Sequence, residues 1–144
     1  MKARELFYIQ IVTFVLLFFL GSLEAVVTNI FLLVPSLVGV AITLYSIYTL
    51  GPKSFSPFPF PTKNSEFIEK GLYKSVRHPM YFGLEIIGLA LVLSNLRLES
   101  VLVFLFLIYI LNLKADLEEE LLSQKFPQYA EYKIRTRKFI PYLY

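Results

Sequence analysis

The chain has 144 residues, a length that suits one compact unit and is short for two ordinary domains. Its composition is 56% hydrophobic and only 17% charged, which is too apolar for a small soluble domain and favours a bilayer as its surroundings. The lack of cysteine excludes disulfides and thiolate catalysis, and a single histidine cannot build a histidine cluster, so we expect no metal site. The net charge of +3 gives no indication of nucleic-acid binding.

Two uncharged runs in the first third of the chain predict two membrane-spanning helices. The first, residues 6–23, has 18 residues, which lies in the lower part of the range around the typical 20 or so. Lys2 and Arg4 before it also resemble the start of a signal peptide, but because further apolar segments follow, we expect a retained span. The second run predicts a span over residues 27–50, in which Pro35 kinks the helix without ending it.

A proline-rich stretch follows the second predicted span. Residues 51–61 hold four prolines, a pattern that forbids regular helix and favours an extended connection. Such a stretch can be a plain linker. However, Phe55, Phe58 and Phe60 are interleaved with the prolines, so we expect a segment that lies along the membrane interface or forms the wall of a pocket.

The remaining apolar segments predict a third span over residues 79–96 and a fourth over residues 99–114. Glu85 interrupts the third span; an ionisable residue there is a functional candidate, and a protonated, structural carboxyl is an equal alternative. The fourth segment is short for a span, and we expect the Lys114 side chain to snorkel back to the interface. Because no helix breaker follows, the same helix is expected to continue out of the bilayer as residues 115–125.

Beyond a break at Pro127, residues 128–136 predict a short helix outside the bilayer. If the N-terminus is cytoplasmic, thirteen Lys and Arg residues lie on the inner side and only Arg97 lies outside, which is a strong positive-inside bias. We therefore predict an all-α, polytopic integral membrane protein with about four transmembrane helices and a cytoplasmic C-terminal helical segment. Residues 1–144 form a single membrane domain, with both termini in the cytoplasm.

The most informative stretch is residues 71–83, GLYKSVRHPMYFG. The residue before a proline is pushed away from helical geometry, and proline suits the first helical position, so we expect His78 to cap a helix that begins at Pro79. The free amides of a helix start favour anions, and Arg77 adds a full positive charge beside them. The stretch thus predicts a cationic notch at the membrane surface that can hold a charged small molecule.

A second informative stretch is acidic and follows the fourth predicted span. Glu118, Leu122 and Phe126 recur at four-residue spacing and share one helical face. One alternative is a solvated helix end in which Lys114 and Glu118 form an ordinary ion pair. Because the predicted topology brings these carboxylates to the same membrane face as Arg77, we prefer a functional role.

The chain contains the motifs GxYxxxRHPxYxG, then EExxLxxxF, then YxxY and a final FIP. Together these motifs resemble the isoprenylcysteine carboxyl methyltransferase family. The related membrane phospholipid methyltransferases share much of this pattern. The resemblance runs from Gly51 onward and implies that residues 51–144 are the catalytic half of the chain.

The resemblance implies a membrane enzyme that transfers a methyl group from S-adenosylmethionine (SAM) to a lipid-like acceptor. Carried over by position, the implied cofactor-binding residues are Tyr73, Arg77, His78, Pro79, Tyr81, Glu118 and Glu119. Of these, Arg77 and Glu119 are the expected catalytic residues. Carboxylates can accept hydrogen bonds from the ribose diol or the ammonium of SAM, while helix-start amides can hold its carboxylate. Methyl transfer is an in-line displacement, so alignment and exclusion of water supply most of the catalysis.

Three functions remain open from the sequence. We expect the acceptor to be a lipophilic molecule with a carboxylate or another polar head, in contact with membrane lipids. A phospholipid N-methyltransferase is the alternative within the same class, and it would make His78 the obvious base. A non-catalytic membrane scaffold is the alternative from another class; in it, His78 would only cap a helix and Tyr81 would only anchor the interface.

Overall fold

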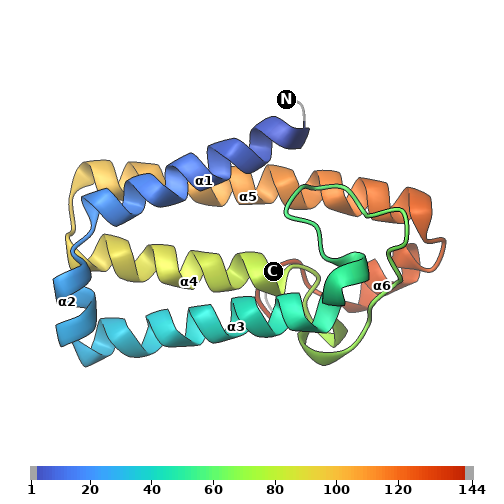
Figure 1. The fold of residues 1–144 in the computed structure, drawn as a ribbon, viewed down its shortest axis with the longest axis horizontal. Helices are drawn as coiled ribbons and strands as arrows, with labels where there is room; N and C mark the ends of the chain where they lie inside the picture. The colour runs from blue at the N-terminus through green and yellow to red at the C-terminus, as the bar shows by residue number, and fades with distance from the viewer. Residues whose placement is uncertain (1–2, 142–144) are drawn as a thin grey trace.

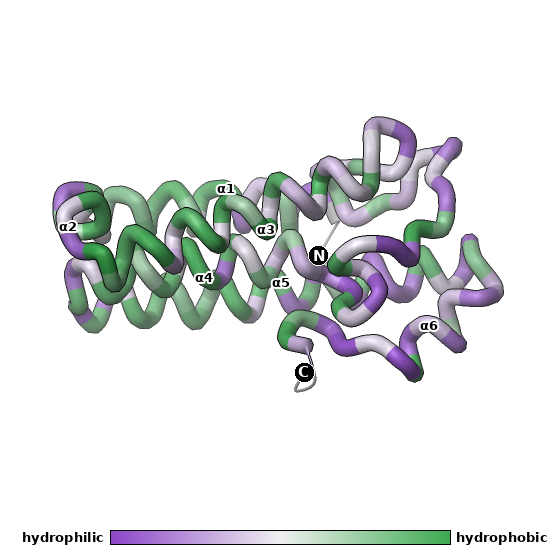
Figure 2. Tube along the Cα trace, turned by 90° about the horizontal axis from the view of Figure 1, so that it is seen from below, coloured by the Kyte–Doolittle hydropathy of each residue, from purple (hydrophilic) through white to green (hydrophobic). Residues whose placement is uncertain are grey.

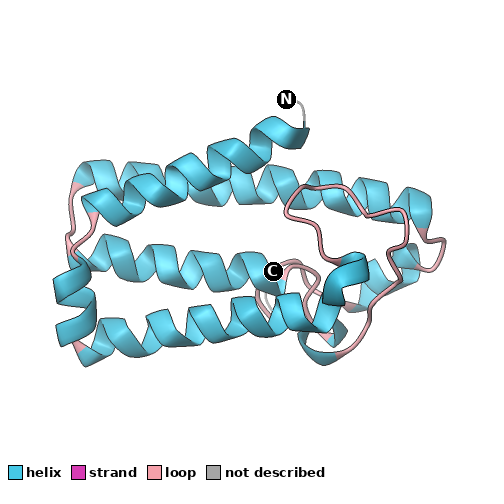
Figure 3. Cartoon of the chain, viewed as in Figure 1, coloured by secondary structure: helices cyan, strands magenta, loops and turns pink. Residues whose placement is uncertain are grey.

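The computed structural model describes residues 3–141, and this part of the chain consists of helices and loops (Figures 1 and 3). The elements are α1 (Ala3–Leu20), α2 (Leu23–Thr28), α3 (Ile30–Ser54), the short 3-10 helix η1 (Gly71–Lys74), α4 (Pro79–Ser94), α5 (Leu98–Lys125) and α6 (Tyr129–Arg135). Within the described residues, extended pairing is limited to one isolated bridge between Val76 and Arg137. The predicted all-α class is confirmed. Lys2, which the charge count includes, lies outside the described residues.

The four long helices run side by side along the longest axis of the molecule (Figure 1). Helix α3 packs along α4, α1 packs along α5, and the short α2 crosses one end of the bundle. The long loop after α3, η1 and α6 gather at the opposite end. Figure 2 shows that the bundle is mainly apolar, whereas the end with the loops is mainly polar. The fold therefore separates an apolar body from one polar end.

The outer surface of the bundle is apolar. Helices α3 and α5 are long and apolar enough, by length and composition, to cross a membrane, and α4 is a shorter apolar helix. Large apolar side chains on both long helices are exposed, among them Phe31, Leu37, Leu44, Leu102 and Leu105. Exposed apolar surface on this scale suits lipid and does not suit water. These features agree with the predicted membrane protein.

The second predicted span differs from the structure at both ends. Helix α3 begins only at Ile30, because Asn29 has extended geometry and its side chain accepts a hydrogen bond from the Phe31 amide at 3.0 Å. This is an ordinary N-cap that separates α2 from α3. At the other end, Gly51 adopts a φ of +68°, yet a further helical turn follows up to Ser54. The proline-rich stretch thus begins with a helical turn that the sequence did not predict. The other long helices begin near the predicted positions.

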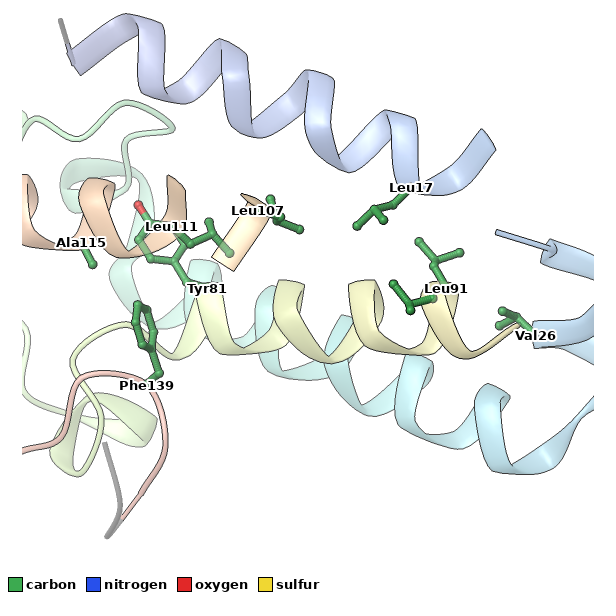
Figure 4. Close-up of a cluster of buried hydrophobic side chains, with 9 residues drawn as sticks. Leu17, Val26, Tyr81, Leu91, Leu107, Leu111, Ala115 and Phe139 are labelled. Carbon is green, nitrogen blue, oxygen red and sulfur yellow. The ribbon is translucent and has the colours of Figure 1, made fainter. Parts of the chain in front are cut away.

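The hydrophobic core runs the length of the bundle (Figure 4). Its buried members are Leu17, Val26, Tyr81, Leu91, Val92, Leu107, Leu111, Ala115 and Phe139. Most of these side chains are aliphatic, but the cluster ends in two aromatic rings at the polar end. One of them, Phe139, belongs to the segment after α6 and points toward the start of α4 (Figure 4). The core therefore holds the C-terminal segment against the bundle.

Candidate functional site

The backbone of the C-terminal segment pairs with the segment before α4. The Arg77 amide donates to the Arg137 carbonyl at 2.8 Å, and the His78 amide donates to the Lys138 carbonyl at 3.0 Å. In the opposite direction, the Arg137 amide donates to the Ser75 carbonyl at 3.0 Å. These bonds bring together segments that are about sixty residues apart in the chain. They fix the backbone from which Arg77 and His78 project.

The Arg77 side chain is buried in a network of charged and polar groups. Its Nε donates to Glu119 Oε1 at 2.8 Å, and the two side chains are only 9% and 3% exposed. Its Nη1 donates to the Thr136 carbonyl at 2.6 Å and to the Lys133 carbonyl at 3.2 Å. A buried charge is tolerated when it is paired and hydrogen-bonded in this way. Arg77 thus joins α5 to the C-terminal segment.

Glu119 is enclosed by cations. Besides Arg77, it accepts from Lys133 Nζ at 2.7 Å, and its Oε1 lies 3.2 Å from His78 Nε2. The residue is 2% exposed and does not line the adjacent pocket described below. Its two oxygens are already engaged by this chain. Glu119 is therefore suited to positioning Arg77 and His78, and less suited to direct contact with a ligand.

His78 occupies the N-cap position of α4, and α4 begins at Pro79 as predicted. The prediction that its side chain caps the helix is wrong, because the ring makes no capping hydrogen bond. Instead, Nε2 faces Glu119 and Nδ1 lies 3.5 Å from Glu118 Oε2. Charge-assisted contacts with two carboxylates are stronger than a bond to a backbone amide. The ring also stacks on Tyr81 with centroids 5.5 Å apart.

These surroundings favour the imidazolium form of His78. Burial lowers the pKa of His78, but the hydrogen bonds and negative charges of Glu118 and Glu119 outweigh burial and raise the pKa above its ordinary value of 6.5. The folded protein therefore holds this proton more tightly than the unfolded chain does.

The thermal midpoint of the detergent-solubilised protein is expected to fall as the pH rises above the ordinary histidine pKa of 6.5. Stabilisation by the His78 imidazolium is fully present below the unfolded pKa and is lost as the pH rises through the higher folded pKa. Thermal unfolding followed by circular dichroism at a series of pH values measures this slope. His78→Gln should flatten it. An equal slope in the wild type and in His78→Gln would contradict the assignment to this ring.

Glu118 differs from its neighbour because it is open to a pocket. The Tyr81 hydroxyl donates to Glu118 Oε1, and the Glu118 side chain is 20% exposed. Successive side chains on a helix point about 100° apart, so one carboxylate faces the buried cluster and the other faces the pocket. Leu122 and Phe126 line the same pocket, as expected from their shared helical face with Glu118.

The pocket lies at the polar end and has an empty volume of about 830 Å³, counted out to its open mouth. Its aromatic lining consists of Phe58, Phe60, Phe67, Tyr73, Tyr81, Phe126, Tyr129 and Tyr132. Its polar lining consists of Ser54, Ser56, Ser65, Glu66, Arg77, His78 and Glu118. Phe58 and Phe60 belong to the proline-rich stretch, which is therefore a pocket wall and more than a plain linker. Burial raises the pKa of Tyr73, Tyr129 and Tyr132, so these phenols stay neutral.

The residues predicted for a cofactor pocket lie together at this end. Those that line the pocket are Tyr73, Arg77, His78, Tyr81 and Glu118. Pro79 is buried at the first position of α4, and Glu119 lies behind Arg77 and His78. Glu85 is partly buried on α4 and is not among the lining residues.

Sequence reasoning missed several residues of the site. Tyr129 and Tyr132 enter the sequence analysis only as the YxxY of the family pattern, with no role at the site. Both line the pocket, and the Tyr132 hydroxyl donates to the Tyr73 carbonyl at 2.6 Å. Their three-residue spacing next to a helix break was the available signal. Lys133 and Thr136 gave no signal of their own, because an exposed helix end is normally rich in such residues.

The prediction that Lys114 snorkels to the interface is wrong. The residue is 1% exposed, and its Nζ donates to Gln10 Oε1 and to the Pro57 carbonyl, both at 2.8 Å. The ammonium also lies 5.1 Å from the centre of the Tyr81 ring. These partners come from distant parts of the chain and draw the side chain inward.

Comparison with known proteins gives one family and two relatives. A sequence model of the isoprenylcysteine carboxyl methyltransferase family matches residues 30–124. A nickel-cobalt-cadmium resistance protein of Alcaligenes xylosoxydans xylosoxydans is 33% identical over 84 residues, and a cobalt-zinc-cadmium resistance protein of Cupriavidus metallidurans is 36% identical over 84 residues. Each alignment covers 56% of this chain and 38% of the relative, so the chain spans well under half the length of either protein.

Proposed function

We propose a function from the premise that this chain belongs to the isoprenylcysteine carboxyl methyltransferase family. In our proposal it is a SAM-dependent membrane methyltransferase that transfers a methyl group to a carboxylate or another polar head of a lipophilic acceptor. The observation that carries the proposal is the open carboxylate of Glu118 in an aromatic pocket, backed by the buried pair of Arg77 and Glu119. This pocket lies where the apolar bundle meets its polar end, which suits a charged cofactor and a lipophilic acceptor.

The chemistry of the pocket residues fits SAM. When bound, SAM would supply an electrophilic methyl group on a sulfonium. Glu118 and Glu66 offer carboxylates to cationic groups or to a ribose diol, and the tyrosine and phenylalanine rings offer faces to adenine or to positive charge. Arg77 and the His78 imidazolium offer positive charge to a carboxylate.

The proposed roles of the residues are binding, alignment and exclusion of water. The Tyr81 hydroxyl holds one oxygen of Glu118, so that the carboxylate keeps one orientation toward the pocket. Arg77 and Glu119 position the backbone and the ring of His78. The aromatic walls reduce the access of water, which strengthens the electrostatic contacts inside. Alignment of two bound molecules can supply a large part of the rate of a displacement.

A carboxylate acceptor fits this site better than an amine. Methylation of an amine requires a base that removes a proton, and His78 would be the nearest candidate. Its ring is already held between Glu118 and Glu119 in a setting that favours the imidazolium, which makes it a poor base. This favours carboxyl methylation over the alternative of a phospholipid N-methyltransferase.

The proposal includes the membrane topology. We propose four spans, near residues 6–23, 27–50, 79–96 and 99–114, with both termini in the cytoplasm and the pocket at the cytoplasmic face. The positive-inside bias of the sequence supports this orientation. A lipophilic acceptor could then reach the pocket sideways from the bilayer. The names of the two relatives concern metal resistance, and our proposal does not carry that role to this chain.

Calorimetric titration of SAM into the detergent-solubilised protein tests the proposal. We expect saturable binding, and with radiolabelled SAM we expect transfer of label to a lipophilic carboxylate. A methyl ester is cleaved by base whereas an N-methyl group is not, so alkaline release of the label distinguishes the two acceptor classes. Absence of heat at millimolar SAM would favour the membrane scaffold. Base-stable label in an amine lipid would favour the N-methyltransferase.

A further inference from the structure

Two lysines of α5 face the proline-rich loop from the same side of the helix. Lys114 and Lys125 are about three helical turns apart. Both reach residues 57–65, a segment that we call the strap. Figure 1 shows the loop after α3 crossing toward α5 before it returns to η1. Neither lysine belongs to the family motifs described above.

The ammonium of the first contact is buried, since Lys114 is 1% exposed. The Lys114 ammonium donates to the Pro57 carbonyl at the start of the strap and to Gln10 Oε1 of α1, both at 2.8 Å. It also lies 5.3 Å from the centre of the Phe7 ring and 5.1 Å from that of Tyr81. A buried ammonium is costly unless it is hydrogen-bonded. One cation therefore links α1, α4 and α5 to the first residue of the strap.

The second contact holds the other end of the strap. Lys125 Nζ donates to the Thr62 carbonyl at 2.5 Å, to the Lys63 carbonyl at 3.1 Å and to Ser65 Oγ at 2.7 Å. These three acceptors match the three donors of an ammonium. The strap is thus fastened to α5 near both of its ends.

Between these contacts, the strap forms part of the pocket. Phe58, Phe60 and Pro61 line it, and Pro59 is fully buried. Proline has no amide proton, so this stretch cannot be held by a regular ladder of backbone hydrogen bonds. Its position therefore depends strongly on contacts from elsewhere. The two lysines of α5 supply part of these contacts, beside the packing of the Phe58 ring on the Phe7 ring at 4.9 Å between centroids.

We propose that Lys114 and Lys125 are positioning residues that hold the strap in place as a wall of the ligand pocket, and that Gln10 completes the contact of Lys114. The identity of the ligand rests on the proposed function, but the position of the wall does not. Gln10 lies before the part of the chain that matches the family, residues 30–124. Helix α1 therefore contributes to the pocket through a side chain outside that part.

A single-cysteine reporter tests this proposal, because the natural chain has no cysteine. Ser56→Cys places a nearly isosteric thiol next to Pro57, and its reaction with N-ethylmaleimide in detergent reports opening of the strap. In this background, Lys114→Met keeps an unbranched side chain that is one atom shorter, and it removes the charge. Loss of charge-assisted hydrogen bonds should speed labelling by about tenfold to a hundredfold. Lys125→Met should also speed it.

The matched control is Leu17→Ala, a core substitution in α1 far from the strap along the chain. It should lower the thermal midpoint without faster labelling at temperatures where the protein is folded. Unchanged labelling in both lysine variants would overturn the proposal, and so would an equal acceleration in Leu17→Ala. If Lys114→Met does not fold, Lys125→Met decides the outcome. Lys125 is the last residue of α5, so its replacement should disturb the helix bundle less.

A second readout separates positioning from general stability. The lysine variants should raise the dissociation constant of SAM several-fold, while kcat at saturating SAM stays within about twofold of the wild type, since neither lysine lines the pocket. Loss of kcat with unchanged affinity would overturn the positioning role. If the wild type binds no SAM, the proposed function fails, but the labelling rates still decide whether the lysines hold the strap.

Discussion

Replacing Glu118 with glutamine is expected to weaken SAM binding by about tenfold to a hundredfold and to leave the protein folded. Glutamine keeps the shape of the side chain and one oxygen that can accept from the Tyr81 hydroxyl, but it loses the charge and the second acceptor oxygen, which faces His78 Nδ1. A hydrogen bond to a charged group contributes about 1.5–3 kcal/mol, and each 1.4 kcal/mol or so is a factor of ten in affinity. Calorimetric titration measures the affinity, and circular dichroism checks the fold.

Glu120→Gln is the matched control for this substitution. Glu120 undergoes the same change of charge on the same helix, but it is exposed and does not line the pocket. It should bind SAM like the wild type. Equal affinity in the wild type, Glu118→Gln and Glu120→Gln would show that Glu118 makes no contact with the cofactor, and the proposed binding mode would have to be abandoned.

Replacing Arg77 with alanine is expected to lower the free energy of unfolding by about 3 kcal/mol, the lower end of the range for breaking a buried ion pair. The lower end applies because Glu119 keeps two other partners, His78 and Lys133. The substitution also removes the hydrogen bond to the Thr136 carbonyl, so the C-terminal segment should become more sensitive to proteases. Denaturant titration of the detergent-solubilised protein measures the loss of stability.

Arg137→Ala serves as the control. It also removes one arginine charge, from the C-terminal segment that pairs with the Arg77 backbone. The Arg137 side chain is exposed, and its backbone alone pairs with Ser75 and Arg77. We expect a change within about 0.5 kcal/mol, as is usual for surface substitutions. Similar stability of the Arg77→Ala and Arg137→Ala proteins would mean that the buried network contributes little to the fold.

The parts of the fold that follow from local patterns could be predicted from the sequence. Long apolar runs predict the long helices, and proline at positions 79 and 127 correctly marks a helix start and a helix break. The break at Asn29 was missed, because one asparagine in an apolar run is also compatible with a continuous membrane helix. The extra turn after Gly51 was missed as well, since the prolines that follow argue against helix.

Most of the site residues that the sequence predicted belong to the GxYxxxRHPxYxG and EExxLxxxF motifs. These motifs bring Arg77, His78, Tyr81, Glu118 and Glu119 together, and the structure has these side chains in contact. The motifs do not tell which of two adjacent glutamates faces the pocket, because that depends on the rotation of α5 against its neighbours. Nor do the motifs predict the direction of the His78 side chain. Its ring contacts the carboxylates of Glu118 and Glu119, which lie about forty residues away in the chain.

Lys114 illustrates the same limit. A lysine near the end of an apolar helix normally extends toward water, and the local sequence contains nothing that argues against this. Its real partners, Gln10 and the Pro57 carbonyl, are 104 and 57 residues away. The direction of a long charged side chain is therefore set by tertiary contacts that a periodic pattern does not contain.

The pairing of Arg137 and Lys138 with the segment before α4 also sets the order in which the molecule matures during its synthesis. Chains are made and folded from the N-terminus, so the long helices can enter the bilayer before the ribosome has made residues 129–138. Until then, Arg77 lacks the Thr136 carbonyl and Glu119 lacks Lys133. A nascent chain interrupted before this segment would occupy the membrane with its helices in place and its pocket unfinished. Under the proposed function, the ability to bind the cofactor would therefore be acquired only after insertion, as a late and separate step.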